Sequence, residues 1–269
     1  MSKPDSSENT TSQASTLPPV LAGPLLRHTA QDALTLWLIT SRPTELFLRL
    51  SHGDTHLINR NLAENELSQL QVGTRAWLNL ISVTPKKPLP TDVRLEYDLG
   101  LQTDREADTL WIRDWAPHLC PDDQARPGFM IKSRLDRILH GSCRRPHHPS
   151  ADGLTRVDRE IQTATTLEDT PALLLLTGDQ IYADDVAGPM LHAIHCVIHQ
   201  LGLFQEPLEG ASLSHSRELT SKDQAYYHRD KLLPESEFNE DLTERFFGGV
   251  RKPVFTTANA GNHLISFAE

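Results

Sequence analysis

The 269-residue chain has little cysteine, few aromatic residues and no long apolar run. Its three cysteines, Cys120, Cys143 and Cys196, are too sparse for the disulfide framework of a secreted scaffold. Because a membrane-spanning helix needs roughly 18 apolar residues in a row, we expect no membrane partner. Residues 1–19 have no basic start followed by an apolar core, so no secretory signal is expected. These absences predict a cytoplasmic protein.

Positive charge is also in deficit. The chain has 26 Lys and Arg against 36 Asp and Glu, which gives a formal net charge of -10. A nucleic-acid backbone is therefore not expected as a general partner. Carboxylates in excess are compatible with binding of hard metal ions. The length allows one large domain or two ordinary ones with a sizeable core.

The pattern along the chain divides it into four parts. Residues 1–19, rich in Ser, Thr and Pro, predict a disordered tail. Alternating apolar residues around 34–38, 46–50, 77–83 and 93–101 predict an antiparallel β-sandwich over residues 20–117. Residues 118–129 are expected to be a linker, and residues 130–269 an α/β domain. The predicted fold class is α/β, with the sandwich first.

A polar stretch from residue 205 to about residue 241 interrupts the second domain. Two interpretations remain open: a solvated helical hairpin, which we favour, or an insertion that shapes substrate access. No internal repeat is present in the sequence.

The most informative segment is residues 171–185. Four leucines, Leu173 to Leu176, predict a short strand covered on both faces, as in a parallel sheet. Gly178 and Asp179 follow directly, and ligands of open α/β sheets bind outside the carboxyl ends of strands. Glycine lets the backbone turn sharply and lets a metal or phosphate approach. The segment therefore predicts an oxygen-rich site at a strand end.

A second strand end of the same kind lies one βαβ unit upstream. Residues 137–141 predict a short strand that ends at Gly141 and is followed by Ser142 and Cys143. Apolar residues at helical spacing over 154–161 predict a helix between the two strands, and Asp152 is its expected N-cap. A right-handed crossover would bring Cys143 and Asp179 to the same sheet edge.

These motifs resemble a known family. The stretches Gly141-Ser142-Cys143-Arg144 and Gly178-Asp179-Gln180-Ile181-Tyr182 are similar to the PhoD-like branch of the metallophosphatases, related to alkaline phosphatase D. Residues 262–269 also resemble a segment of that branch. The resemblance implies a metal-dependent phosphatase or phosphodiesterase whose substrate is a phosphate ester. It further implies a β-sandwich ahead of a metallophosphatase-type α/β sandwich.

The resemblance also implies a dinuclear metal site. Cys143 and Tyr182 would ligate a ferric ion, and Asp179 would bridge it to a second ion such as calcium or another divalent ion. A ferric ion favours anionic ligands and would hold these groups as thiolate and phenolate.

Catalysis is assigned to Asp179 and Arg144 in this interpretation. Arg144 or Arg145 would neutralise charge on the ester oxygens. His263, in a Gly-Asn-His sequence, is a weaker candidate for the substrate path.

The family supplies further ligands, including a Trp-Asp-Asp-His type motif, after the segment that resembles residues 267–269. This chain has no such motif. We therefore expect the 269 residues alone to be inactive, as a truncated copy with half of the site. We also expect an exposed apolar sheet face and strand edge, and a complementing C-terminal fragment as a possible partner.

Several alternatives compete with these assignments. Taken alone, Cys143 would be a small packing residue. Asp184 and Asp185 are expected to cap the following helix rather than bind metal, and Asn262 is expected to cap a helix too. His192, His195 and His199 could form a zinc site on a helix. The neighbouring apolar residues at 191, 194 and 198 favour an ordinary core helix instead.

Two further functions follow from these alternatives. The chain could be a noncatalytic binding module that acts through its β-sandwich, or a zinc-binding protein that uses the helix histidines. The metal-dependent hydrolase remains the favoured interpretation.

Overall fold

The computed structural model describes residues 17–102, 108–120, 124–145, 148–209, 211–220, 226–232 and 259–269. Residues 1–16 of the expected disordered tail lie outside these ranges. Within them the chain is mixed α/β, with ten strands and three α-helices, and the two larger sheets are antiparallel. In the same part of the chain, no helix is long and apolar enough to cross a membrane.

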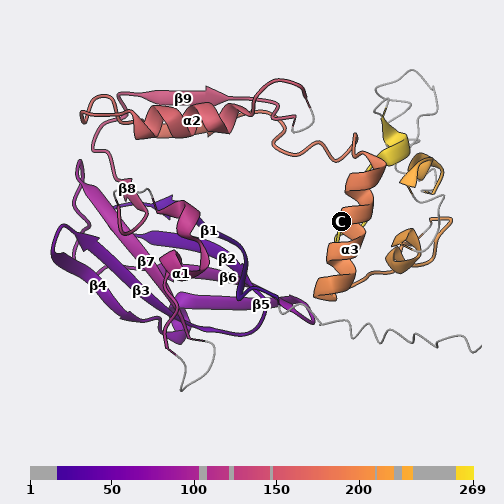
Figure 1. The fold of residues 1–269 in the computed structure, drawn as a ribbon, viewed down its shortest axis with the longest axis horizontal. Helices are drawn as coiled ribbons and strands as arrows, with labels where there is room; N and C mark the ends of the chain where they lie inside the picture. Colours follow the sequence, from indigo (N-terminus) through magenta and orange to yellow (C-terminus); the bar gives the residue numbers. More distant parts are fainter. Residues whose placement is uncertain are drawn as a thin grey trace, which may run out of the picture.

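Eight strands and three short helices come first along the chain (Figure 1). They are β1 (Val20–Thr29), β2 (Leu34–Thr40), β3 (Glu45–His52), β4 (Thr55–Asn61), η1 (Glu64–Glu66), β5 (Leu67–Gly73), β6 (Ala76–Val83), β7 (Arg94–Gln102), α1 (Ile112–Trp115), η2 (Pro117–Leu119) and β8 (Gly128–Met130). The later elements are β9 (Ile138–Gly141), α2 (Gly153–Gln162), β10 (Leu173–Leu176), α3 (Gly188–Leu201), η3 (Ser216–Thr220), η5 (Arg229–Lys231) and η6 (Ala260–Asn262).

Two four-stranded sheets form the first half. Their strand orders are β1-β2-β6-β5 and β4-β3-β7-β8, and every pairing in them is antiparallel. The alternation of apolar residues predicts this arrangement, because successive side chains of a strand point to opposite faces. The inward leucines at positions 34, 36 and 38 of β2 and at 46, 48 and 50 of β3 are buried in one shared core. Each contributes about 1.5–3 kcal/mol through burial.

The segment at 118–129, expected to be a linker, contributes to this first half. η2 overlaps its start, and β8 begins at Gly128 and pairs with β7. The same core includes Cys120 and Ile131. The second sheet and its core therefore extend to Ile131, two residues beyond the expected linker.

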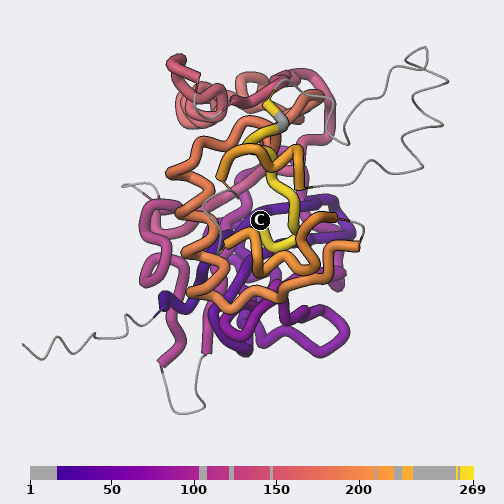
Figure 2. The backbone as a smooth tube through the Cα atoms, turned by 90° about the vertical axis from the view of Figure 1, so that its right-hand side faces the viewer, coloured from indigo at the N-terminus to yellow at the C-terminus, as the bar shows by residue number. Residues whose placement is uncertain are grey.

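A parallel strand pair with one helix follows. β9 and β10 pair in parallel, in a register that sets Leu176 opposite Gly141. Helix α2 connects them, and the side chain of Asp152 accepts a hydrogen bond from the N–H of Leu154 as its N-cap. These observations confirm the predicted strand, helix and cap. In Figures 1 and 2 this unit lies at one end of the molecule, beyond β8.

The expectation that the leucine strand is covered on both faces is wrong. The side chains at 173 to 176 are 36–45% exposed. The reason is that, within the described residues, β10 has one neighbouring strand, and α2 covers one face of the pair. A two-stranded sheet with a single helix leaves its outer face in solvent.

Helix α3 connects back to the first half. Its last turn ends at Gly202, whose positive φ of 59° is typical of a glycine C-cap. There Gly202 and Leu201 accept hydrogen bonds of 2.9 Å from the backbone N–H groups of Thr74 and Arg75, in the turn between β5 and β6. The C-terminal end of α3 is thus attached to one corner of the sandwich (Figure 2).

The polar stretch from residue 205 differs from the predicted helical hairpin. Its described parts contain the 3-10 helices η3 and η5 and no α-helix, while residues 210, 221–225 and 233–241 lie outside the described ranges. Nor are these parts fully solvated, because Leu213, Ser216, Leu219 and Arg229 are buried.

Candidate metal centre at the ends of β9 and β10

The ends of the two parallel strands hold their following loops side by side. Directly beyond the strands, the N–H of Thr177 donates to the carbonyl of Gly141 at 3.1 Å. Further along, the N–H of Arg144 donates to the carbonyl of Asp179 at 2.7 Å. The thiol-bearing loop and the carboxylate-bearing loop are therefore joined by main-chain bonds. Such bonds fix the two loops independently of any side chain.

Cys143 occupies an unusual backbone position at this junction. Its φ is 54°, in the left-handed region that non-glycine residues seldom adopt. Its Sγ lies 3.3 Å from Oγ of Ser142. An added Cβ at Gly178 would clash with that hydroxyl and would lie 2.7 Å from both N and Sγ of Cys143. Glycine at 178 thus permits the close approach of the two loops.

The thiol of Cys143 and the phenol of Tyr182 are hydrogen-bonded to each other. Hydrogen bonds from Ser142 and then from Tyr182 lower the pKa of the Cys143 thiol below its ordinary value. The bond to Cys143, together with desolvation and the charges of Cys143 and Asp179, raises the pKa of Tyr182. The interaction between the phenol and the thiol contributes to both of these opposite shifts.

The donor types present match the metal that the resemblance implies. A thiol, a phenol and the carboxylate of Asp179 come from two loops whose main chains are bonded together. Sulfur and phenol oxygen become anionic ligands when they lose their protons to a cation. Among the described residues, no group of three or more His, Cys, Asp and Glu could hold a metal ion. The candidate trio is of another kind, because its third member is a tyrosine.

Arg144 is held by the carboxylate that caps α2. Its Nε lies 3.0 and 2.9 Å from Oδ1 and Oδ2 of Asp152, and its Nη2 lies 2.6 Å from Oδ2. This pairing and the N–H of Leu154 lower the pKa of Asp152 to about 2. One carboxylate thus orients the arginine and begins the helix.

Arg145 has a partner of its own. It forms an ion pair with Asp185. The prediction that Asp184 or Asp185 caps the next helix is wrong, because the N-cap of α3 is Ala187 and no side chain caps it. Asp185 instead connects the loop after β10 to the loop after β9.

The described residues place His263 and Asn262 beside the segment that follows Tyr182. The N–H of Leu264 donates to the carbonyl of Ala183 at 2.8 Å. Asn262 is the last residue of η6, and its side chain donates to the carbonyl of Val186 at 2.9 Å. The prediction that Asn262 caps a helix is therefore wrong. Nδ1 of His263 lies 2.5 Å from the carbonyl oxygen of Leu264.

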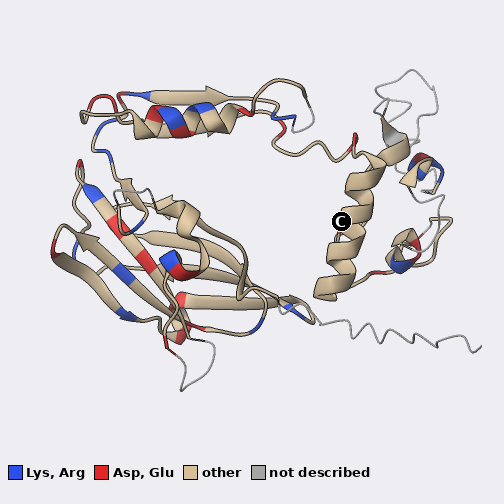
Figure 3. Cartoon of the chain, in the orientation of Figure 1, with Lys and Arg blue, Asp and Glu red and all other residues tan. Residues whose placement is uncertain are grey.

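The three histidines of α3 do not share one environment. His195 is buried between Leu191 and Ile198, whereas His192 and His199 are exposed. Nδ1 of His192 lies 3.2 Å from the hydroxyl of Tyr226. Helix α3 carries no Lys, Arg, Asp or Glu, which Figure 3 shows as an uncoloured helix.

Sequence reasoning missed a buried charged cluster. The carboxylate of Glu269 accepts from Nε2 of His195 at 2.6 Å and from Nη2 of Arg229 at 2.7 Å. It also accepts from the N–H groups of Ile265 and Ser266. Burial raises the pKa of Glu269, but the bonds from His195 and Arg229 outweigh it and lower the pKa to about 2.

No periodic pattern marks this cluster. Its members lie far apart in the sequence, and the polar composition around Arg229 is typical of a solvent-exposed segment. The carboxylate joins the terminal stretch to α3 and η5.

No family model matches the chain, and no curated protein matches it.

Proposed function

We propose that the protein is a metal-dependent phosphoester hydrolase of the PhoD-like type. The observation that carries the proposal is the bonding of two loops, which brings Cys143 together with Tyr182 beside Asp179 at the ends of parallel strands. Ligands of open α/β sheets bind at this location. The finer fold that accompanies the proposal is the first part of a metallophosphatase-type sandwich, beginning with β9, α2 and β10.

Three side chains would hold the metals. Cys143 and Tyr182 would ligate ferric iron, and Asp179 would bridge it to calcium or another divalent ion. When bound, such a pair of ions supplies positive charge to a phosphate ester and activates water for in-line attack. Because Cys143 and Tyr182 would hold the metal as thiolate and phenolate, metal uptake would release protons.

The arginines have the role of binding the ester. Arg144 donates two hydrogen bonds from Nε and one from Nη2, and all three go to Asp152. Nη1 carries two further N–H donors in the same plane. A guanidinium held in this way loses little entropy when it binds a phosphate oxygen. Asp152 acts on the substrate through Arg144, and Asp185 acts through Arg145.

The experiment is a hydrolysis assay on the 269-residue chain. Release of nitrophenol from 4-nitrophenyl phosphate and from its bis ester is measured with and without added iron and calcium. Hydrolysis that needs iron, is lost in Asp179→Asn and is kept in Asp158→Asn supports the proposal. Asp158 is a matched control because it is an exposed carboxylate on α2.

Two other outcomes decide the remaining points. Hydrolysis that Asp179→Asn leaves unchanged contradicts the proposal. Turnover that Asp179→Asn abolishes contradicts the expectation, drawn from sequence, that the 269 residues alone are inactive. Iron bound at Cys143 and Tyr182 without any turnover supports the metal site and contradicts hydrolysis by this chain.

A further inference from the structure

A cavity of about 650 Å³ lies between the β9–β10 pair and α2. Its volume falls within the roughly 300–1,000 Å³ of small-molecule sites. The sheet contributes Leu139, Leu174 and Leu176, and the helix contributes Leu154 and Val157. These five apolar side chains form a trench under the helix. The trench is an apolar extension of the candidate metal centre.

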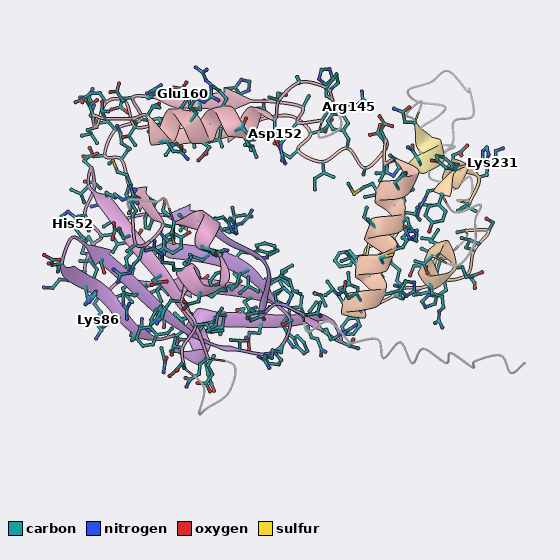
Figure 4. All side chains as sticks on the ribbon, viewed as in Figure 1. His52, Lys86, Arg145, Asp152, Glu160 and Lys231 are labelled. Atoms are coloured by element: carbon teal, nitrogen blue, oxygen red, sulfur yellow. The ribbon has the colours of Figure 1, made fainter. Side chains whose placement is uncertain are left out.

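The two ends of the trench are polar. At the mouth the lining includes Cys143, Arg144 and Arg145. At the far end the carboxylate of Glu160 binds Arg137 at 2.7 Å and Arg156 at 2.6 Å. Figure 4 shows Arg145 and Asp152 near one end of α2 and Glu160 near the other. A ligand along the trench therefore contacts apolar walls between two charged ends.

The cavity lining holds more positive than negative side chains. Three arginines and two carboxylates line the cavity, so its lining carries one net positive charge in a chain of net charge -10. Asp185, which binds Arg145, and Asp179 lie beside the mouth outside this lining. Arg144 still has the Nη1 donors for an oxygen anion. The phosphate group of an ester is accordingly placed at Arg144.

The apolar walls are incompletely covered. Leu174 is 36% exposed and Leu176 is 40% exposed, although both face the cavity. Covering such surface with an apolar group is favourable, and each buried methylene tightens binding about fourfold. An ester without an apolar group leaves these leucines in water.

We propose that the substrate class of this site is a phosphate ester with a linear alkyl group, whose phosphate lies at Arg144 and whose alkyl chain lies in the trench. The inference rests on the proposed function. From Leu154 to Glu160 the helix rises roughly 9 Å, because each residue adds about 1.5 Å. An extended chain advances about 1.2 Å per bond, so the trench accommodates about seven carbons.

The test is a calorimetric titration of the metal-free, full chain with methyl, butyl, hexyl and decyl phosphate. The expected result is an affinity that rises up to fourfold per methylene and levels off at about seven carbons. Hexanol serves as the ligand without phosphate, and inorganic phosphate as the ligand without a chain. Both should bind more weakly than hexyl phosphate.

Variants locate the alkyl chain. Val157→Phe fills the trench with apolar volume and should remove the dependence on chain length while inorganic phosphate still binds. Val157→Asp should do the same by placing a charge there. Ile161→Asp is the matched control, because Ile161 is on the same helix but is 54% exposed and is not in the cavity lining. It should leave the dependence intact.

Equal affinity for methyl and hexyl phosphate would overturn the proposal, and so would hexanol that binds as tightly as hexyl phosphate. A dimer that Val157→Asp dissociates, without any chain-length effect, would assign the trench to a second copy instead. The outcomes that contradict the proposed function differ from those that contradict the trench. Alkyl phosphates that bind by length but are never hydrolysed with iron contradict the hydrolase alone, and hydrolysis without length preference contradicts the trench alone.

Discussion

The main-chain N–H of Arg144 donates a hydrogen bond to the carbonyl of Asp179 at 2.7 Å. These two residues follow different strands, and the bond joins their loops at the point where Cys143 and Tyr182 meet. Because the bond involves backbone atoms, substitutions of either side chain leave it in place. Changes in the backbone at this junction should therefore disturb the site more than side-chain changes nearby.

Gly178→Ala tests the close approach of the loops. The added Cβ would clash with Ser142 and lie 2.7 Å from the backbone N of Cys143, so the loops must separate. We expect a loss of about 1–3 kcal/mol in the free energy of unfolding, measured by urea denaturation, since overpacking of this kind costs that much. The control is Gly153→Ala at the start of α2, where an added Cβ meets nothing within 4 Å. An equal effect at both positions would contradict the account.

Substitutions at Cys143 test its left-handed backbone. With φ at 54°, glycine suits the position better than alanine. We expect Cys143→Gly to unfold at a higher urea concentration than Cys143→Ala. The order should be reversed at Cys196 in α3, where glycine costs about 1 kcal/mol relative to alanine. If the alanine variant were the more stable one at both cysteines, the backbone at 143 would not be strained.

Glu269 should make stability depend on pH. Its pKa of about 2 lies below the value of about 4.3 expected for an unfolded chain. A depressed pKa stabilises the fold fully above pH 4.3, and this contribution disappears as the pH falls through 2. The shift corresponds to roughly 3 kcal/mol. Amide hydrogen exchange of α3 between pH 5 and pH 2 measures it.

The matched variant for this prediction is Glu269→Gln. It keeps the shape of the side chain and removes its titration, while Arg229 stays buried and loses its counter-charge. The protection of the α3 amides, relative to exchange from an unfolded chain at the same pH, should then be lower at pH 5. It should also change less on acidification. If the protection of α3 had the same pH profile in Glu269→Gln as in the unsubstituted protein, Glu269 would not stabilise α3.

Asp152 tests the link between the helix and Arg144. Asp152→Asn keeps an N-cap oxygen for Leu154 but loses the ion pair, whereas Asp152→Ala loses both. We expect amide exchange in α2 to be faster in the Ala variant than in the Asn variant. In the unsubstituted protein the protection should decline as the pH falls from 4 towards 2, because the pKa of Asp152 is lowered to about 2.

Much of the local structure could be predicted from sequence, because it depends on neighbouring residues. The alternating leucines of β2 and β3 specify buried strands, and Asp152 before Leu154 specifies a helix start. The approach of Cys143 to Asp179 follows from parallel pairing after one crossover.

What could not be predicted depends on contacts between distant segments. The exposure of Leu175 is set by how many neighbours the strand has, and four leucines in a row do not reveal that. Asp185 looks like a helix cap until Arg145 is placed beside it. The burial of Arg229 requires the carboxylate of Glu269, from a segment well separated along the chain.

The most direct test of the metal centre is the visible absorption of the iron-loaded chain. A ferric ion held by Tyr182 and Cys143 should give a tyrosinate-to-iron charge-transfer band with stoichiometric iron. This band should disappear in Tyr182→Phe. Tyr227→Phe is the control, because Tyr227 is 55% exposed and contacts Gly188 rather than the site. A band that survives Tyr182→Phe, or iron that binds the variant equally well, would contradict the central claim.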